Sequence, residues 1–416
     1  MKRNMHVGVR FFLGFLLLTS PVFAQKSAAA AEAVKAPIFE VDPLWPKPMP
    51  NHWILGAVIG VSIDKDDNVW ILHRPNTPEK MEVYAANTPP GSQCCIPAPP
   101  VLEFNQAGDL IGHWGGPGQG YDWANNNHGI YVDYKGFVWV GGNGHTTDPK
   151  IYPGAPNSIP EGTFKGAMAD NSVLKFTKDG QFVMQIGHPF QSKGDVDTEN
   201  LNGPAGISVD PKTDDLYIAD GYGNNRVIVF DANTGKFRRQ WGAYGNKPVD
   251  DTLGDYDPDA PVDQQFRSPL HCARLSNDGL VYVCDRRNDR IQVFHTDGTF
   301  VKEMFINKRT LGDGSVSDIA FSRDPQQRYI YVADLSNDQI HILLRDTLET
   351  LTSFGDGGRQ PGQFYAPHSI ATDSKGNIYT TETFRGQRVQ KFIYKGIGPV
   401  TKDDQGVVWP KPATAK

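Results

Sequence analysis

Short apolar segments separated by turns recur along most of the chain. In each copy a strand of small apolar residues ends in Asp or Ser, a turn follows, and a second strand of the Ile-Tyr-Val type comes next. The six copies of this strand pair are 61–64 with 69–72, 130–133 with 138–140, 207–210 with 216–220, 273–276 with 281–285, 319–322 with 330–334, and 370–373 with 378–382. A third strand, an Asp-Gly or similar turn, and a fourth strand ending near Trp-Gly or Phe-Gly follow most copies. Four antiparallel strands per repeat are typical of a propeller blade, so the pattern predicts an all-β fold with six blades.

The predicted propeller occupies residues 37–400 and carries long inserted loops. The main insertions, rich in Pro, Gly and Asp, fall at about 75–100, 143–170 and 244–267. An open ring would leave unpaired strand edges, which are a liability because they pair with other chains. We therefore expect residues 38–41 to close the ring by pairing with the last blade. Residues 401–416 are expected to form a C-terminal tail.

The first 24 residues have the pattern of a secretory signal. Positive residues precede the apolar run 11–18, and small residues stand before a cleavage site after Ala24. The alternative is a membrane anchor, but the run is shorter than a bilayer span requires. Residues 25–36 are Ala-rich and are expected to form a flexible tether. The pattern predicts a periplasmic or secreted protein with no membrane span after the signal is removed.

Composition narrows the class of partner. The 416-residue chain has a formal net charge of -6, so it lacks the basic surface that nucleic-acid binding requires. Its four Cys are too few for a disulfide scaffold. Cys272 and Cys284 have matching offsets from the turn at 277–279, so a cross-strand disulfide is plausible in an exported protein. Cys94 and Cys95 are adjacent, and either form a vicinal disulfide or stay reduced.

One position of the repeat carries His in every second copy. The residues just before the six innermost strands are Ile59, His128, Ala205, His271, Ser317 and His368. Alternate blades of a six-bladed ring are related by approximate three-fold symmetry, and the innermost strands line the central channel. The three imidazoles should therefore converge, and three His with an open fourth position suit Zn²⁺ or another divalent metal. The alternative is that they are three unrelated His, each capping a turn.

Two Arg and one Tyr fall near the same end of the predicted channel. Arg74 and Arg286 directly follow the second strand of their blades, and Tyr222 lies one residue further along in its own blade. Guanidinium groups bind carboxylates bidentately, and a Tyr beside a metal and an Arg can act as a base. The alternatives are surface ion pairs for the Arg residues and a packed loop aromatic for Tyr222. The acidic residues that end the second strands are expected to bond turn amides instead: Asp220, Asp285, Asp334 and Glu382.

These residues carry a resemblance to a known family. The motifs concerned are 71–74, 128–130, 219–222, 269–271, 283–288 and 367–369, and the run 362–370 carries the usual lead-in of an NHL repeat. Over about residues 50–395 the chain resembles the peptidyl-α-hydroxyglycine α-amidating lyases, which are six-bladed NHL-type propellers. The resemblance implies zinc on His128, His271 and His368, a catalytic pair of Tyr222 and Arg74, and Arg286 in the substrate site.

The reaction implied by the resemblance is the cleavage of a carbinolamide, in which a peptidyl- or N-acyl-α-hydroxyglycine gives an amide and glyoxylate. The substrate is then a small molecule or peptide with a C-terminal carboxylate. The chain departs from the animal members at three positions, where Ser369 replaces an Asp, Ala366 a Met and Gly223 a Cys. That Asp belongs to a calcium site, so a structural Ca²⁺ is doubtful here.

Two other functions compete with the lyase. The first is a non-catalytic NHL propeller that binds a peptide or protein partner on its loop face, since a fold by itself does not define a function. The second is a propeller lactonase or other hydrolase. Such enzymes usually bind metal through carboxylates and Asn, and the starts of the innermost strands show no matching set. The alternating His therefore favour the lyase.

Overall fold

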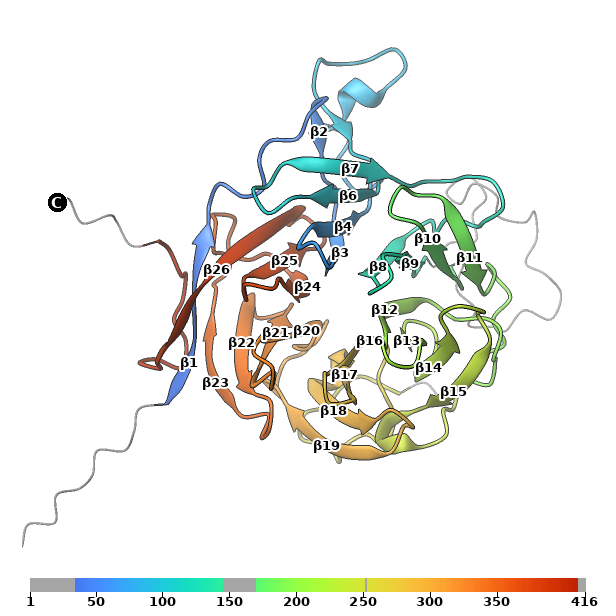
Figure 1. Ribbon diagram of the computed structural model, residues 1–416, viewed down its shortest axis with the longest axis vertical. Helices are drawn as coiled ribbons and strands as arrows, with labels where there is room; N and C mark the ends of the chain where they lie inside the picture. Colours follow the sequence, from blue (N-terminus) through green and yellow to red (C-terminus); the bar gives the residue numbers. More distant parts are fainter. Residues whose placement is uncertain (1–33, 145–169, 251–252, 411–416) are drawn as a thin grey trace, which may run out of the picture. The chain divides into compact units, whose positions relative to one another are not determined.

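Six four-stranded antiparallel sheets surround a central axis in the computed structural model (Figure 1). The model describes residues 34–144, 170–250 and 253–410. Within these residues the structure confirms the six-bladed, all-β propeller. The predicted signal 1–24, most of the tether 25–36 and most of the insertion 143–170 lie outside the described residues.

The first three blades run from the channel outward in chain order. Blade 1 contains β3 (Val58–Ile63), β4 (Val69–His73), β6 (Val101–Phe104) and β7 (Leu110–Trp114). Blade 2 contains β8 (Asn127–Val132), β9 (Val138–Gly142), β10 (Val173–Phe176) and β11 (Phe182–Ile186). Blade 3 contains β12 (Pro204–Val209), β13 (Asp215–Asp220), β14 (Arg226–Asp231) and β15 (Phe237–Trp241).

The other three blades complete the ring. Blade 4 contains β16 (Leu270–Leu275), β17 (Leu280–Asp285), β18 (Arg290–His295) and β19 (Phe300–Phe305). Blade 5 contains β20 (Asp318–Phe321), β21 (Tyr329–Asp334), β22 (Gln339–Leu344) and β23 (Thr350–Phe354). Blade 6 contains β24 (Pro367–Thr372), β25 (Ile378–Glu382), β26 (Arg388–Pro399) and β1 (Lys35–Asp42). The loops add the short parallel pair β2 (Trp53–Ile54) and β5 (Ile96–Pro97) and three 3₁₀ turns, η1 (Tyr84–Ala86), η2 (Ala243–Gly245) and η3 (Arg286–Asn288).

The N-terminal strand closes the ring, as predicted. β1 pairs antiparallel with β26 of the last blade, and it begins at Lys35, two residues before the predicted boundary of the propeller. The C-terminal segment also contributes, since Asp403 and Val408 accept backbone hydrogen bonds from Ser353 and Val41. Part of the predicted tail therefore packs against blades 5 and 6. No helix in the described part of the chain is both long and apolar enough to cross a membrane.

One buried aromatic side chain per blade explains the Ile-Tyr-Val signature. These residues occupy the same position of the second strand, and all are nearly or fully buried: Trp70, Trp139, Tyr217, Tyr282, Tyr331 and Tyr379. The Trp70 indole N–H donates to Asp64 at 3.1 Å, and the Trp139 indole N–H donates to Asp133 at 2.9 Å. In blades 1 and 2 the Asp that follows the innermost strand therefore satisfies the polar atom of the buried indole.

The four Cys form two disulfides. Cys272 and Cys284 lie opposite each other on β16 and β17 and form the expected disulfide, and Cys94 and Cys95 form a vicinal one. The acidic residues that end the second strands are structural, as expected. Each accepts a backbone N–H: Asp220 from Asn202, Asp285 from Arg267, Asp334 from Asn337 and Glu382 from Tyr365.

Candidate functional site

The three His predicted from the repeat lie on the innermost strands of blades 2, 4 and 6. His128, His271 and His368 are each the second residue of their strand, so these strands begin three residues before the predicted starts at 130, 273 and 370. The pairing registers of β16 and β24 skip His271 and His368. Such β-bulges bend a strand and re-aim a side chain, and here they direct the imidazoles toward the axis.

The three imidazoles meet as predicted. Their ring centroids are 4.6 to 5.0 Å apart. One ring nitrogen from each lies within 4.8 Å of the other two, and all three side chains are buried. Three nitrogen donors at this spacing match the protein ligands of an open tetrahedral zinc site.

The blades without His orient these rings through their backbone. The His271 Nδ1–H donates to the Ser317 carbonyl at 2.5 Å, and the His368 Nδ1–H donates to the Ile59 carbonyl at 2.9 Å. The Nδ1 atom of His128 is buried without a hydrogen-bond partner. Ser317 and Ile59 stand at the equivalent repeat position of the blades that lack His. His271 and His368 are therefore each held by the next blade, with Nε2 left to bind a metal at the axis.

The electrostatic environment keeps the ring neutral. Burial lowers the pKa of all three imidazoles well below the ordinary value, and the Arg286 guanidinium lowers each of them further. A neighbouring imidazole adds to the shift of His128 and His271, and Arg74 adds to the shift of His128 and His368. Neutral imidazole is the form that binds metal. The Nε2 atom of His271 is buried without a hydrogen-bond partner, which is costly unless a ligand satisfies it. The residues present therefore fit a divalent metal ion.

Tyr222 lies directly beside this ring. Its hydroxyl is 3.0 Å from His128 Nε2, and the Arg286 Nη1 is 3.5 Å from the same hydroxyl. The backbone of the loop after β13 is held on both sides, since Tyr222 N–H donates to Gly203 and its carbonyl accepts from the Ser268 hydroxyl. The structure thus brings Tyr222 and Arg286 together beside the His ring, as the sequence predicted.

Arg74 lies on the other side of the site and is fixed by blade 2. Its Nε donates to the Asn127 carbonyl at 2.9 Å, and its Nη2 donates to Asn143 Oδ1 at 3.0 Å. Burial lowers its pKa, while electrostatic interaction with Tyr222 and Asp170 opposes that shift. The Asp170 carboxylate accepts three backbone N–H groups and is itself held at the site.

Arg286 is fixed by a residue that sequence reasoning missed. Its Nη2 donates to Asp313 Oδ1 at 3.1 Å, and Arg287 donates to the same oxygen at 2.7 Å. Asp313 lies in the loop before β20, and Asp170 lies in the loop before β10. Neither loop has a counterpart in the other blades, so the repeat could not indicate that these two acids belong to the site. The Nε of Arg286 is buried and has no partner, which leaves a donor for a ligand.

A buried ion pair lies behind the His ring. Arg274 donates through Nε and Nη2 to both carboxylate oxygens of Asp318, at 2.9 and 2.7 Å, and through Nη1 to the Ile207 carbonyl at 3.0 Å. Asp318 also accepts from the Ser369 hydroxyl at 2.7 Å. Ser369, which stands in place of the family's calcium ligand, is thus bonded to an acid already paired with Arg274. Arg274 was detectable in the sequence, because it is the one charged residue at that position of the six innermost strands.

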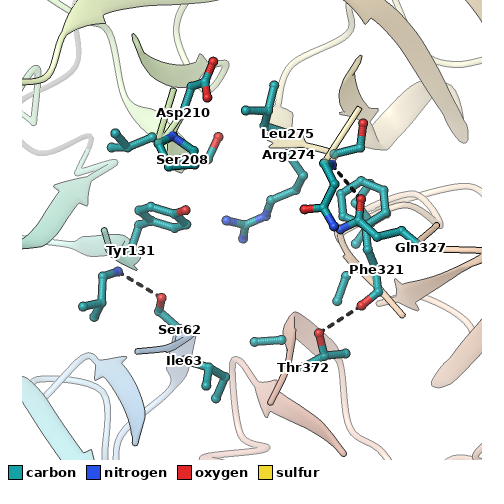
Figure 2. Close-up of a pocket in the computed structure, with 18 of the residues that line it drawn as sticks. Ser62, Ile63, Tyr131, Ser208, Asp210, Arg274, Leu275, Phe321, Gln327 and Thr372 are labelled. Atoms are coloured by element: carbon teal, nitrogen blue, oxygen red, sulfur yellow. Dashed lines mark hydrogen bonds between the residues drawn. The ribbon is translucent and has the colours of Figure 1, made fainter. Parts of the chain in front are cut away.

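Arg274 separates two cavities along the axis. A small one of about 10 Å³ lies against the His ring, and one of about 330 Å³ lies further along the channel. Arg274 lines both, and Figure 2 shows its side chain extending into the larger cavity with Tyr131, Ser62 and Thr372 around it. The guanidinium therefore lies between the ring and the larger cavity.

Comparison with known proteins agrees with the repeat and with the resemblance. A family model for the NHL repeat matches residues 201–230. The chain is 24% identical over 375 residues to peptidyl-alpha-hydroxyglycine alpha-amidating lyase 1 of Drosophila melanogaster, covering 85% of this chain and 59% of that protein. It is 27% identical over 258 residues to peptidyl-glycine alpha-amidating monooxygenase A of Xenopus laevis, covering 61% of this chain. NHL repeat-containing protein 3 of Homo sapiens is 24% identical over 401 residues, covering 93% of this chain and 94% of that protein.

The extent of these matches differs. The chain spans 23% of the length of the Xenopus laevis monooxygenase and 59% of the Drosophila melanogaster lyase, whereas it spans nearly all of the human NHL repeat-containing protein 3. The matches extend over much of the region in which the sequence motifs lie. The chain is an NHL-repeat β-propeller, and its resemblance to the peptidyl-α-hydroxyglycine α-amidating lyases is confirmed.

Proposed function

We propose that the chain is a metal-dependent carbon–nitrogen lyase that splits an N-acyl- or peptidyl-α-hydroxyglycine into an amide and glyoxylate. The observation that supports this proposal most directly is that three neutral, buried imidazoles meet at the axis, with the Tyr222 hydroxyl 3.0 Å from His128. A module that only bound a partner on its loops would not need these groups buried together. The name of the Drosophila melanogaster relative, an alpha-amidating lyase, supports the same class of reaction.

Arg286 is the proposed binding residue for the substrate carboxylate. Its Nε is buried without a partner, and its other nitrogens are positioned by Asp313 and the Tyr222 hydroxyl. A charge-assisted hydrogen bond from a guanidinium is short and roughly twice as strong as a neutral one. This contact would place the hydroxylated carbon of the substrate near Tyr222 and the His ring.

Tyr222 is the proposed acid–base residue, with Arg74 as the nearby positive charge. It takes the proton of the substrate hydroxyl while that oxygen forms the carbonyl of glyoxylate. The carbon–nitrogen bond breaks, its electron pair goes to the amide nitrogen, and Tyr222 returns the proton to that nitrogen. The atoms balance without water. The Arg74 guanidinium interacts electrostatically with Tyr222.

The metal would be held by Nε2 of His128, His271 and His368. When bound, a divalent ion supplies Lewis acidity toward a substrate oxygen, and Zn²⁺ suits three imidazoles with an open position. The Nδ1 hydrogen bonds of His271 and His368 to backbone carbonyls keep their rings oriented for this role. We further propose that the protein works in the periplasm or outside the cell, on the basis of the N-terminal sequence.

Glyoxylate release from α-hydroxyhippurate tests the proposal. The assay compares the zinc-loaded protein with the same protein after chelation and dialysis, and subtracts the uncatalysed breakdown of the substrate. We expect release that is lost on chelation and restored by zinc. Release that is absent from a folded sample carrying one equivalent of zinc would overturn the lyase and favour a binding module.

A further inference from the structure

A groove of about 830 Å³ begins at Tyr222 and runs between two loops of the propeller. One wall comes from the insertion around Leu253 and Tyr256, and the other from Leu311 and Asp313 before β20. A volume of this size is in the range of pockets that enclose drug-sized ligands. It is far larger than a glyoxylate unit needs.

The two walls of the groove are tied to each other. The Tyr256 hydroxyl donates to the Lys308 carbonyl at 2.8 Å, and its ring faces the Arg267 guanidinium at 5.5 Å. Arg267 in turn donates to Asn288 Oδ1 at 2.9 Å and pairs with Asp263. These contacts hold the groove in shape without a ligand, and a preformed site saves the cost of ordering on binding.

The chemistry of the lining is mixed. Arg267 is bonded to Asp263, Arg287 is bonded to Asp313, and Asp255 contributes a further carboxylate. Beside these charged groups the groove offers a ligand apolar surface from Leu253, Tyr256 and Leu311. Leu311 is 62% exposed, so its side chain is accessible to a ligand in the groove.

The geometry at the head of the groove decides which part of a substrate enters it. Arg286 contacts both the Tyr222 hydroxyl and Asp313, and Asp313 lines the groove. With the carboxylate on Arg286 and the hydroxyl toward Tyr222, the third substituent of the reacting carbon is the amide nitrogen. The cavity on the far side of the ring lies behind Arg274. The acyl group therefore has this groove as its path.

We infer that the groove binds the acyl side of the substrate and selects a bulky, apolar acyl group, such as benzoyl or a peptide that places a hydrophobic side chain next to the hydroxyglycine. This inference rests on the proposed function and names its substrate class. Leu311 and Tyr256 are the residues that determine the preference. Burial of an aromatic ring gains roughly 1.5–3 kcal/mol, which corresponds to about a tenfold or larger preference in binding.

The experiment measures kcat/KM for glyoxylate release from N-benzoyl- and N-acetyl-α-hydroxyglycine. We expect the benzoyl substrate to be preferred by about tenfold or more. Leu311→Ser and Tyr256→Ala should each reduce that preference by about fivefold. The matched control is Ile111→Ser, because Ile111 is a 51% exposed aliphatic residue on β7, outside the groove. The control should keep the preference of the unmodified protein.

Calorimetric binding of N-benzoylglycine and N-acetylglycine separates this inference from the proposed function. These compounds lack the hydroxyl and cannot react, so they report on the groove even if no substrate is turned over. Tighter binding of the benzoyl compound, weakened by Leu311→Ser but not by Ile111→Ser, supports the inference. Equal affinity for the two compounds, or a preference unchanged in both groove variants, overturns it. If neither substrate is turned over but the binding preference is intact, the lyase proposal is overturned and the inference about the groove stands.

Discussion

The Nδ1 atom of His368 lies 2.9 Å from the carbonyl oxygen of Ile59, so an imidazole of the last blade is bonded to the innermost strand of the first. The same pattern links His271 to Ser317. Two of the three proposed metal ligands therefore also form contacts between neighbouring blades. Metal binding and the packing of the blades around the axis share these side chains.

Removing one of the three imidazoles should abolish metal binding without unfolding the propeller. We expect His271→Ala to reduce bound zinc from one equivalent to less than about 0.1, because two remaining imidazoles bind zinc too weakly to survive dialysis. The readouts are metal content and the circular dichroism spectrum. His295→Ala, which changes an exposed His on β18, is the control and should keep one equivalent. If His271→Ala retains a full equivalent, the ligand assignment is wrong.

The Tyr222 hydroxyl is expected to matter for turnover and not for metal content. Tyr222→Phe removes the group that lies 3.0 Å from His128 while keeping the ring. General acid–base groups contribute typically 10²–10⁴-fold, so kcat for glyoxylate release should fall by about that factor. Zinc content should stay at one equivalent. Tyr134→Phe, at an exposed Tyr in blade 2, provides the comparison and should retain full activity. A Tyr222→Phe protein with unchanged kcat would exclude this hydroxyl as the proton carrier.

The Arg274–Asp318 pair behind the ring should behave as a buried ion pair. Arg274→Met leaves the Asp318 carboxylate, only 4% exposed, without its cation, and we expect a loss of about 3–5 kcal/mol in unfolding free energy. Arg274→Met combined with Asp318→Asn should recover most of that loss, because an Asn side-chain oxygen still accepts from Ser369. Urea denaturation measures both. Additivity of Arg274→Met and Asp318→Asn would show that the pair is not coupled.

The buried His73 is expected to make the free energy of unfolding fall in acid. Burial lowers its pKa from 6.5 to about 4, although its contacts with the backbone at Pro99 and Ala98 oppose the shift. Between pH 6.5 and 4 the unfolded chain binds a proton that the folded protein does not. The stabilising contribution is therefore complete above pH 6.5 and is lost as the pH falls toward 4, by about 3 kcal/mol.

The test is the change in unfolding free energy between pH 7 and pH 4 in the metal-free protein. In His73→Gln this change should shrink by about 3 kcal/mol relative to the unmodified protein. Comparing the same two pH values in both proteins cancels opposing groups such as Asp195, whose pKa burial raises to about 7. His295→Gln, at an exposed site, should leave the change as it is. An identical pH dependence in His73→Gln would contradict the assignment.

Much of the fold and the centre of the site could be predicted from the sequence. The repeat determined the number of blades, the strands within them and the closing strand, because each blade must bury the same aromatic position against its neighbour. Since repeated units around an axis impose near-symmetry, His in every second copy was enough to bring three imidazoles together. The sequence placed them just before their strands, whereas they lie within them, because a β-bulge leaves no mark in the hydrophobic pattern.

The tertiary structure alone decided which backbone atoms orient the site residues and how the inserted loops surround the site. The carbonyl groups that orient His368 and His271 belong to Ile59 and Ser317, and a carbonyl has no side-chain signature. Asp313, which positions Arg286, and the groove along Tyr256 belong to loops outside the repeat, where no symmetry relates one segment to another. The sequence by itself therefore determined the ring and its His, since both follow a period. The partners and the substrate groove required the folded chain, since they depend on the paths of loops that follow none.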